Sequence, residues 1–530
     1  MADTVFIGTN PSPKPPSRRR IRWWPVAIIL VLAAGAIFYF RTLYGRSRQD
    51  QNIATASVVI IAIPLLLLWC LLFSRIRWRI RLGIFGVAVG FVALLPLLFR
   101  IHGVTGDLVP VLEWRWQSRN LPSLEKSAKT ASSGSPTQAN QFTNDYPQFL
   151  GPHRNSTVDQ SRLARDWNAQ PPKRLWDHPV GIAWSGFAVS GNRAVTQEQR
   201  GDNEAVVCYE LLSGAVLWSY AYPAHFESSL AGEGPRATPT VAGGKVYALG
   251  ATGILNCLDL ETGKAIWSKD IVQDNQSETN SWGISCSPLV MGDLVVISAG
   301  GRNERSLVAY RAATGEFVWG GGNNGAGYSS PLLTTLAGVS QILNFNGGGV
   351  CSHAASSGKV LWKYPWPGGH PHVSTPVVLP DDRVLISSGY GTGSELVKVK
   401  KDADGIFATT RLWKSVRLKA KFTNLVYRDG FIYGLDDGIM VCLDANTGQL
   451  KWKEGRYGHG QEILAGDVLL VMAESGEVVL LEPNPTQPHE LTRFSALNQK
   501  TWNPPALAGE FLLVRNDKEA ACYRLPLVKP

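Results

Sequence analysis

The sequence predicts an all-β, eight-bladed β-propeller preceded by three transmembrane α-helices. Two features of the chain predict this fold: a repeat in its second part and three long apolar runs in its first hundred residues. The repeat has a period of roughly 40 to 50 residues, which is typical of propellers because a single blade cannot bury its faces alone. We expect the part of the chain outside the apolar runs to form one closed ring.

Each copy of the repeat has a small residue or Cys, a short stretch, a Gly, and a Trp four residues after the Gly. The clear copies are Cys208 to Trp218, Cys257 to Trp267, Ala309 to Trp319, Cys442 to Trp452 and, more loosely, His353 to Trp362. Weaker copies place Trp176, Trp413 and Phe494 in the Trp position, which gives eight blades. No strands precede Trp176, and the chain ends without a final Trp strand. The strand at Trp176 is therefore expected to complete the last blade and leave no open edge.

One blade shows why the repeat forms strands. Short stretches of alternating apolar residues are separated by turns that contain Gly, a pattern typical of antiparallel hairpins. The predicted strands of this blade are 237–242, 246–251, 254–260 and 265–268. Gly supplies positive φ at the turns, and the fixed step from Gly to Trp is expected to wedge the indole between neighbouring blades. The Trp, Gly and Cys of the repeat are thus assigned to the fold and not to chemistry.

Three apolar runs without a charged residue lie at 23–40, 53–73 and 82–99. Each is long enough to cross a hydrocarbon core of about 30 Å as a helix. No small-residue cleavage site follows the first run, so we do not expect a removable signal peptide.

Basic residues predict the orientation of these helices, because Lys and Arg are retained on the cytoplasmic side. Nine lie in the N-terminal tail and in the loop between the second and third helices: Lys14, Arg18, Arg19, Arg20, Arg22, Arg75, Arg77, Arg79 and Arg81. Only Arg41, Arg46 and Arg48 lie in the other loop. The prediction is a multi-pass protein of the bacterial inner membrane with a cytoplasmic N-terminus and a periplasmic propeller. Its predicted domains are a cytoplasmic basic tail (1–22), the membrane helices (23–100), a juxtamembrane segment and linker (101–145) and the propeller (146–530).

The charge of the chain is concentrated in its membrane part. The formal net charge is +10, but residues 1–100 contain 13 Lys plus Arg and only Asp3 and Asp50. The remaining residues are therefore close to neutral, and no nucleic-acid partner is expected. Membrane lipid is the predicted partner of the helices.

The seven cysteines do not predict disulfides. Cys208, Cys257, Cys442 and Cys522 occupy the same strand position in different blades, which is too far apart for a bridge. The chain has no Cys-x-x-Cys motif, so neither a c-type haem nor a thioredoxin-like centre is expected.

The runs CLDLETGKAIW and CLDANTGQLKW resemble the repeat of the pyrroloquinoline-quinone-like (PQQ-like) propellers. This family includes quinoprotein dehydrogenases and the outer-membrane assembly lipoprotein. The segments 146–155, 234–241 and 500–509 look like a membrane-anchored bacterial branch of it. The resemblance covers about residues 146–530 and implies the fold more strongly than any activity.

Loops that lead into the innermost strands of a propeller converge on one mouth of its central channel, where a ligand site would form. The candidate mouth residues are Trp184, Ser185, Glu233, Arg236, Trp282, Tyr328, His372, Lys421, Asn424, Tyr457, His459, Trp502 and Asn503. Two interpretations remain open for them. They either plug the channel and satisfy one another, or they hold a ligand.

The resemblance implies one specific ligand, PQQ stacked on a Trp and held with Ca²⁺ by Glu, Asn and Asp oxygens. Trp282, Trp502, Glu233, Asn424 and Asn503 could supply parts of such a site. However, the adjacent Cys pair common in that family is missing, and Glu233 is the single carboxylate among the candidates. Since Ca²⁺ takes six to eight oxygen ligands, with carboxylates among them, no cofactor is expected. PQQ with calcium remains the alternative.

Three further motifs are weaker. The run from Asp402 to Gly405 resembles the start of a calcium loop, but Trp413 stands where the loop needs Glu. The Gly runs 320–322 and 347–349 lack the Lys that a phosphate loop requires. His370 and His372 have no further His or Cys nearby in sequence, so no metal site is predicted.

We therefore interpret the chain as a membrane-anchored periplasmic propeller that binds a protein partner or small ligand, and catalysis is not expected. Two alternatives are kept. One is a PQQ-dependent dehydrogenase that passes electrons to membrane quinone, and the other is an envelope assembly scaffold like the outer-membrane assembly lipoprotein.

Overall fold

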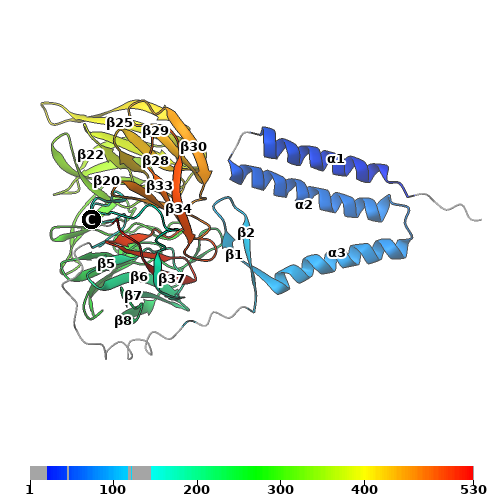
Figure 1. Ribbon diagram of the computed structural model, residues 1–530, viewed down its shortest axis with the longest axis horizontal. Coiled ribbons are helices and arrows are strands. Elements are labelled where there is room, and N and C mark those ends of the chain that lie inside the picture. The colour runs from blue at the N-terminus through cyan, green and yellow to red at the C-terminus, as the bar shows by residue number, and fades with distance from the viewer. Residues whose placement is uncertain (1–20, 45–46, 117–120, 122–144, 529–530) are drawn as a thin grey trace, which may run out of the picture. The chain divides into compact units, whose positions relative to one another are not determined.

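The computed structural model describes residues 21–44, 47–116, 121 and 145–528. The chain forms two compact units (Figure 1). One consists of Met1–Ile101 with Asp107–Gln117, and the other of His102–Gly106 with Ser118–Pro530. The predicted basic tail (1–22) and linker (101–145) lie mostly outside the described residues, and the domain limits stay a prediction.

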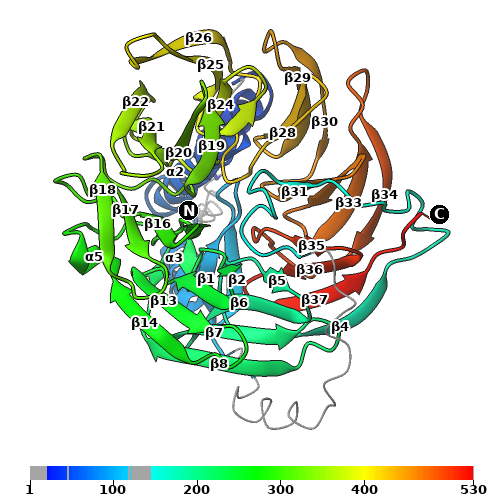
Figure 2. The same ribbon diagram turned by 90° about the vertical axis from the view of Figure 1, so that its left-hand side faces the viewer.

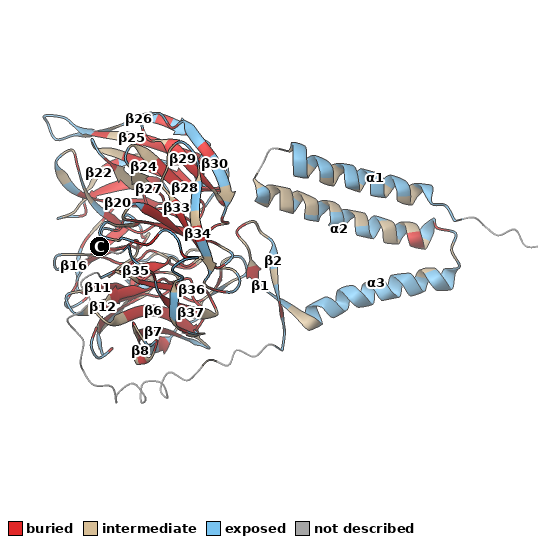
Figure 3. Ribbon diagram, viewed as in Figure 1, coloured by how far each residue is buried: buried red, intermediate tan, exposed pale blue. Residues whose placement is uncertain are grey.

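The first unit contains α1 (Trp24–Phe38), which continues into the π-helical turn η1 (Tyr39–Leu43), then α2 (Arg48–Leu72) and α3 (Trp78–Leu98). All three helices are long and apolar enough to cross a membrane, as predicted. α1 and α3 are mainly exposed, whereas many residues of α2 are of intermediate exposure (Figure 3). α2 begins five residues before the predicted apolar run, because Ser47 caps it by accepting a hydrogen bond from the Asp50 N–H at 3.2 Å.

A two-stranded sheet of β1 (Phe99–Val104) and β2 (Pro110–Trp114) follows the third helix. These strands lie largely within the predicted juxtamembrane segment, for which the sequence indicated no particular secondary structure. The strands are apolar enough to pair, and the Gly-containing stretch between them permits the turn.

Eight blades of four antiparallel strands form the ring, and in the first seven the strands follow chain order from the innermost outward (Figure 2). Blade 1 contains β5 (Ala188–Ser190), β6 (Arg193–Arg200), β7 (Asn203–Glu210) and β8 (Val216–Pro223). Blade 2 contains β11 (Thr240–Ala242), β12 (Lys245–Leu249), β13 (Ile254–Asp259) and β14 (Ala265–Asp270). Blade 3 contains β15 (Leu289–Met291), β16 (Leu294–Ser298), β17 (Leu307–Arg311) and β18 (Phe317–Gly321). Blade 4 contains β19 (Leu332–Leu336), β20 (Val339–Asn346), β21 (Gly349–Ala354) and β22 (Val360–Pro365).

The second half of the ring repeats this order. Blade 5 contains β23 (Val377–Leu379), β24 (Arg383–Ser388), β25 (Gly393–Lys401) and β26 (Phe407–Ser415). Blade 6 contains β27 (Val426–Arg428), β28 (Phe431–Asp436), β29 (Ile439–Asp444) and β30 (Leu450–Arg456). Blade 7 contains β31 (Gln461–Ala465), β32 (Val468–Met472), β33 (Glu477–Glu482) and β34 (His489–Ser495). Blade 8 contains β35 (Ala506–Ala508), β36 (Phe511–Arg515), β37 (Glu519–Arg524) and, from the start of the domain, β4 (Lys173–Pro179).

Four short elements of the propeller unit lie outside this repeat. β3 (Thr157–Val158) adds to blade 7 parallel to β31, and β9 (Glu227–Ser228) pairs with β10 (Gly232–Glu233). A single helical turn, α5 (Ile271–Asp274), follows blade 2.

The ring closes as predicted. β4 pairs antiparallel with β37, and Trp176 lies opposite Cys522 (Figure 2). The same pairing of a small residue with the repeat Trp occurs in other blades, for example Cys257 with Trp267. Two positions of the predicted repeat need correction. Ser352, and not His353, lies opposite Trp362.

The second correction concerns blade 7. In the other blades the Trp pair directly precedes a β-bulge, and in blade 7 that position pairs Leu480 with Thr492. Phe494, predicted to take the Trp position, lies two residues further along β34. It packs edge-on against Trp167, with ring centroids 5.4 Å apart. Blade 7 therefore has no Trp at the repeat position. The Trp167 indole, from the segment before blade 1, packs against Phe494 instead.

The repeat Gly and Trp act together at the blade interfaces. The Trp218 indole donates a hydrogen bond to the Leu260 carbonyl of the next blade at 2.8 Å. Gly263 of that next blade has φ +69°, and an added Cβ would lie 2.5 Å from the Trp218 ring. Gly214 has the same relation to Trp176 across the ring closure. The Gly is therefore required both for its backbone conformation and for the space that the indole takes.

All seven cysteines are buried and free, as predicted. Cys208, Cys257, Cys442 and Cys522 lie on the third strands of four different blades. Their role is packing in the blade cores.

Candidate binding site at the channel mouth

Residues just before the innermost strands join neighbouring blades in a belt of hydrogen bonds. In three blades a backbone N–H donates to a Ser or Thr hydroxyl of the next blade: Gly186 to Thr238 (3.1 Å), Thr238 to Ser287 (3.0 Å) and Ser287 to Ser330 (2.9 Å). Thr375 N–H donates to the Asn424 side-chain oxygen at 2.9 Å. We call these residues, with Gln461 and Asn503, the interblade belt.

The belt continues through amide side chains in the last blades. The Gln461 amide donates to the Phe422 carbonyl at 2.9 Å and to the Trp502 carbonyl at 3.2 Å. The Asn503 amide donates to the carbonyls of Ala183 and Ser185 at 3.0 and 2.8 Å, which returns the belt to blade 1. Asn424 and Asn503, predicted as mouth residues, are buried and belong to this belt. Ser185, also predicted, is buried and supplies one of the carbonyls that the Asn503 amide contacts. These residues join neighbouring blades.

Six aromatic side chains lie together at the mouth, and we call them the aromatic cluster: Trp184, Trp282, Tyr328, Phe422, His459 and Trp502. Ring centroids are separated by 5.1 Å for Trp184 and Trp502, and by 5.2 Å for Phe422 and Trp502. Phe422 lies 6.0 Å from Trp282 and 5.6 Å from His459. Trp282 lies 5.3 Å from Tyr328. The structure thus brings five of the predicted residues together around Phe422, which the sequence analysis missed.

Two lysines lie over this cluster. The Lys500 ammonium is 4.5 Å from the Trp184 ring centroid and 4.2 Å from that of Trp502. The Lys421 ammonium is 5.3 Å from Phe422 and 4.9 Å from Tyr390. A desolvated cation over an aromatic face is stabilised by about 2 kcal/mol. The mouth therefore combines apolar ring faces with fixed positive charge.

A carboxylate completes the mouth. Glu474 accepts hydrogen bonds from the Trp502 indole at 2.9 Å and from the His459 N–H at 3.0 Å. It lies on the turn between the second and third strands of blade 7, whereas the predicted candidates all precede innermost strands. Asp517 lies on the corresponding turn of blade 8 and is 3% exposed. These turns reach the same mouth, and a search of both loop sets could have found the two carboxylates.

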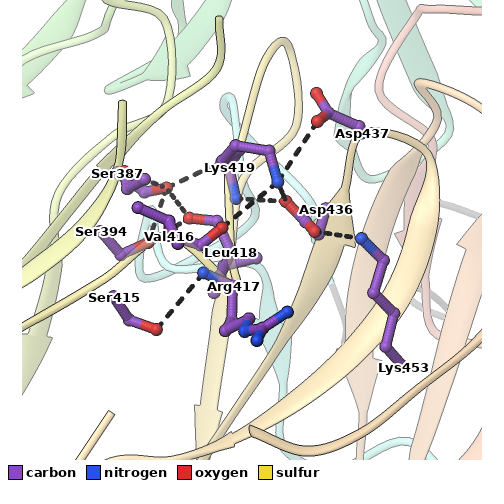
Figure 4. A network of polar contacts seen from close by, with 12 residues as sticks. Ser387, Ser394, Ser415, Val416, Arg417, Leu418, Lys419, Asp436, Asp437 and Lys453 are labelled. Carbon is purple, nitrogen blue, oxygen red and sulfur yellow. Dashed lines mark hydrogen bonds and ion pairs between the residues drawn. The ribbon is translucent and has the colours of Figure 1, made fainter. Parts of the chain in front are cut away.

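The loop that carries Lys421 and Phe422 is held by an ionic network at blade 6 (Figure 4). Asp436 accepts a hydrogen bond from the Lys419 N–H at 2.9 Å and pairs with the ammonium groups of Lys419 and Lys453. Asp437 lies 3.3 Å from the Lys419 ammonium. On the other side, the Ala420 N–H donates to the Ser387 hydroxyl of blade 5 at 3.1 Å. The loop is thus fixed to two blades just before Lys421.

Four predicted residues lie apart from the cluster. His372 stacks on Phe345 at 4.4 Å, and its ring nitrogens lie near the carbonyls of Asn346 and Pro367. The Tyr457 hydroxyl donates to Glu490 on β34 at 3.0 Å.

The other two are Arg236 and Glu233. The guanidinium of Arg236 donates to carbonyls of its own loop, including that of Gly232 at 2.7 Å, and lies 4.6 Å from the Phe226 ring. Burial lowers the pKa of Arg236 to about 10. Glu233 is half-buried on β10.

The opposite end of the channel is covered by residues 146–158. Tyr146 pairs with Val189 of blade 1, and the Ser156 carbonyl accepts from the Leu464 N–H of blade 7 at 2.8 Å. Arg154 is 4% exposed and donates to the belt carbonyls of Ser287 at 3.0 Å and Pro288 at 2.9 Å. Burial lowers the pKa of Arg154 to about 10. The 146–155 motif therefore covers this end of the ring and reaches the belt.

The donors at the mouth differ from those that the PQQ resemblance implies. Glu474 already accepts hydrogen bonds from the Trp502 indole and the His459 backbone N–H. Lys421 and Lys500 already place positive charge at the mouth, and a calcium ion would add to it. Within the part of the chain that the structure describes, no group of three or more His, Cys, Asp or Glu is arranged to hold a metal ion. The residues present do not fit a calcium-bound quinone.

Comparisons with known proteins agree with the fold. A family model described as outer membrane protein assembly factor BamB matches residues 163–277 and 228–454, which together span more than half of the chain. No curated protein matches the chain.

Solved structures similar to this chain include two quinohemoprotein dehydrogenases and a BamB. Quinohemoprotein alcohol dehydrogenase from Comamonas testosteroni is 13% identical with a TM-score of 0.51, over 77% of this chain and 86% of that one. Quinohemoprotein alcohol dehydrogenase ADHIIG from Pseudomonas putida HK5 is 13% identical with a TM-score of 0.50, over 74% and 82%. BamB from Moraxella catarrhalis is 17% identical with a TM-score of 0.49, over 67% and 100%. At these identities the likeness shows the fold alone.

Proposed function

Because the chain belongs to the family described as outer membrane protein assembly factor BamB, we propose that it is a membrane-anchored binding propeller that engages a partner protein without catalysis. The observation that carries this proposal is the aromatic cluster with Lys421 and Lys500 over its rings. Trp, Tyr and Phe are enriched at protein interfaces because they combine large apolar area with few rotatable bonds.

Site-specific cross-linking tests the proposal. A photo-reactive phenylalanine analogue in place of Trp282 should join the full-length protein to a discrete partner in intact membranes. The same analogue in place of Phe317, which is 39% exposed on the outer strand of blade 3, is the control. Adducts at both positions, or at neither, would contradict a partner site at the mouth.

A PQQ-dependent dehydrogenase is the alternative function, and the comparisons with quinohemoprotein dehydrogenases are its support. We propose that no quinone cofactor binds. A bound cofactor would stabilise the fold by about 2.7 kcal/mol at a hundredfold excess over Kd. We therefore expect PQQ with Ca²⁺ to leave the melting temperature of the purified protein unchanged. A calcium-dependent rise that disappears in Trp282→Ala would favour the dehydrogenase.

The proposed location is the bacterial inner membrane, with the N-terminus in the cytoplasm and the propeller in the periplasm. The asymmetry of Lys and Arg between the helix-flanking segments supports it. Alkaline phosphatase, which folds only outside the cytoplasm, should be active when fused after Ser161 and inactive when fused between Arg75 and Arg81. The reverse pattern would place the propeller in the cytoplasm.

A further inference from the structure

Five residues that are distant from the blades in sequence, His102–Gly106, belong to the propeller unit. Their sequence is HGVTG. They lie at the channel mouth and contact side chains from the loops of blades 6, 7 and 8. The imidazole of His102 is paired with the carboxylate of Asp517.

The remaining contacts are to the main chain of this segment. The Lys500 ammonium donates to the Val104 carbonyl at 3.0 Å, and the Lys421 ammonium donates to the Gly106 carbonyl at 2.6 Å. Glu474 accepts from the Gly106 N–H at 2.7 Å. Two cations thus meet carbonyl oxygens and one carboxylate meets an N–H. This pattern recognises the backbone of a strand end, residues 102–104, and of the turn at Gly106, and it does not depend on most of the side chains.

Glycine is required at position 106. An added Cβ there would lie 2.0 Å from the His459 imidazole, which belongs to the aromatic cluster. Gly103 and Gly106 are both buried. The mouth therefore selects a segment with glycine beside the imidazole.

The groups that hold this segment are the same groups that form the proposed binding site. Lys421 and Lys500 are the cations over the aromatic rings, and Glu474 is the carboxylate that holds the Trp502 indole. Lys421 is 4% exposed and Asp517 is 3% exposed. Charges buried this deeply are stable only with partners, so an occupant of the mouth has to supply equivalent polar atoms.

We propose that the channel mouth is a main-chain peptide-binding site and that His102–Gly106 is its resident intramolecular occupant. The partner class is a polypeptide segment in which a strand end is followed by a glycine-containing turn, and this segment displaces the resident occupant. The inference rests on the proposed function, for which it names the partner chemistry. An intramolecular occupant acts at millimolar effective concentration, so the external peptide binds the unmodified chain weakly.

A labelled peptide of residues 99–110 tests this with the full-length protein in detergent. The Gly106→Val chain should bind it at least tenfold more tightly than the unmodified chain, because the variant segment clashes with His459 and leaves the mouth. A peptide that carries the same Gly106→Val change should bind neither chain. Adding Lys500→Gln to the Gly106→Val chain should weaken binding of the unmodified peptide at least tenfold.

His102→Ala is the second variant, because it removes the pair with Asp517 without creating a clash. His102→Ala should also strengthen peptide binding, by a smaller factor than Gly106→Val. Equal affinity for the unmodified, Gly106→Val and His102→Ala chains, or binding to none, overturns the inference. If the peptide binds none while Trp282 cross-links to a partner, the peptide class is wrong and the binding function stands. If the peptide binds as expected without any cross-link, the inference stands and the partner function fails.

Discussion

Replacing Arg515 with Met is expected to destabilise the propeller by about 3 to 5 kcal/mol, the usual cost of removing one partner from a buried charged network. Arg515 is 1% exposed on β36. Its guanidinium donates to the Thr196 hydroxyl at 2.8 Å, the Gln197 carbonyl at 2.9 Å and the Gly181 carbonyl at 2.8 Å. Met would fill the volume but leave these acceptors without their donor.

The effect should be large because of where Arg515 lies. It connects blade 8 to blade 1, the two blades that close the ring. Burial lowers the pKa of the Arg515 guanidinium, and the nearby Glu198 carboxylate opposes that shift. Because an Arg guanidinium stays protonated in proteins, Arg515 is a buried charge at the contact between blade 8 and blade 1.

Unfolding of the full-length protein in denaturant, followed by Trp fluorescence, measures the loss. Arg524→Met is the matched control, because Arg524 lies on the same blade but is largely exposed and pairs with Glu510 at 3.3 Å. An exposed pair of this kind contributes about 1 kcal/mol or less. Similar losses for the two variants would show that Arg515 does not hold the ring closed.

The fold could be predicted because its repeat has a local physical cause. Trp218 needs a neighbour without a side chain, and Gly263 of the next blade provides it, so the two residue types recur together. The prediction failed in blade 7, where a residue from outside the repeat packs at the blade in place of a repeat Trp. In blade 7, Thr492 occupies the Trp position, and Trp167 packs against Phe494 instead.

The mouth could be predicted only in part. Lys421 was predicted and the adjacent Phe422 was missed because both lie in the loop before β27, where no periodic pattern indicates which side chains face the mouth. Glu474 was missed because it lies on a different set of turns. The contacts of His102–Gly106 join residues more than three hundred positions apart, and no periodic pattern encodes them.

The stability of the protein is expected to fall as pH rises from about 4.5 to about 8, because of Glu462. This residue lies on β31 and is 3% exposed. Neither of its carboxyl oxygens has a hydrogen-bond partner among the residues that the structure describes. Burial raises its pKa from the ordinary value of 4.5 to about 8. The folded state therefore holds a proton that the unfolded chain releases throughout this range.

The direction of the pH dependence follows from the difference in the Glu462 pKa between the folded and unfolded states. Below about pH 4.5 both states are protonated and the residue contributes no penalty. Above about pH 8 the folded state also has to lose the proton, and the full penalty of about 5 kcal/mol applies. Glu462→Gln has no proton to lose. It should match the unmodified protein near pH 4.5 and exceed its unfolding free energy by several kcal/mol at pH 9.

Denaturant unfolding at a series of pH values tests this expectation. Glu316→Gln, at a side chain that is 73% exposed, is the control, and its profile should follow that of the unmodified protein. Parallel profiles for Glu462→Gln and the unmodified protein would mean that the carboxyl is solvated in the folded state. The decisive observation is that the difference in unfolding free energy between Glu462→Gln and the unmodified protein shrinks at low pH. A general change in packing would instead shift the unfolding free energy of the variant by the same amount at every pH.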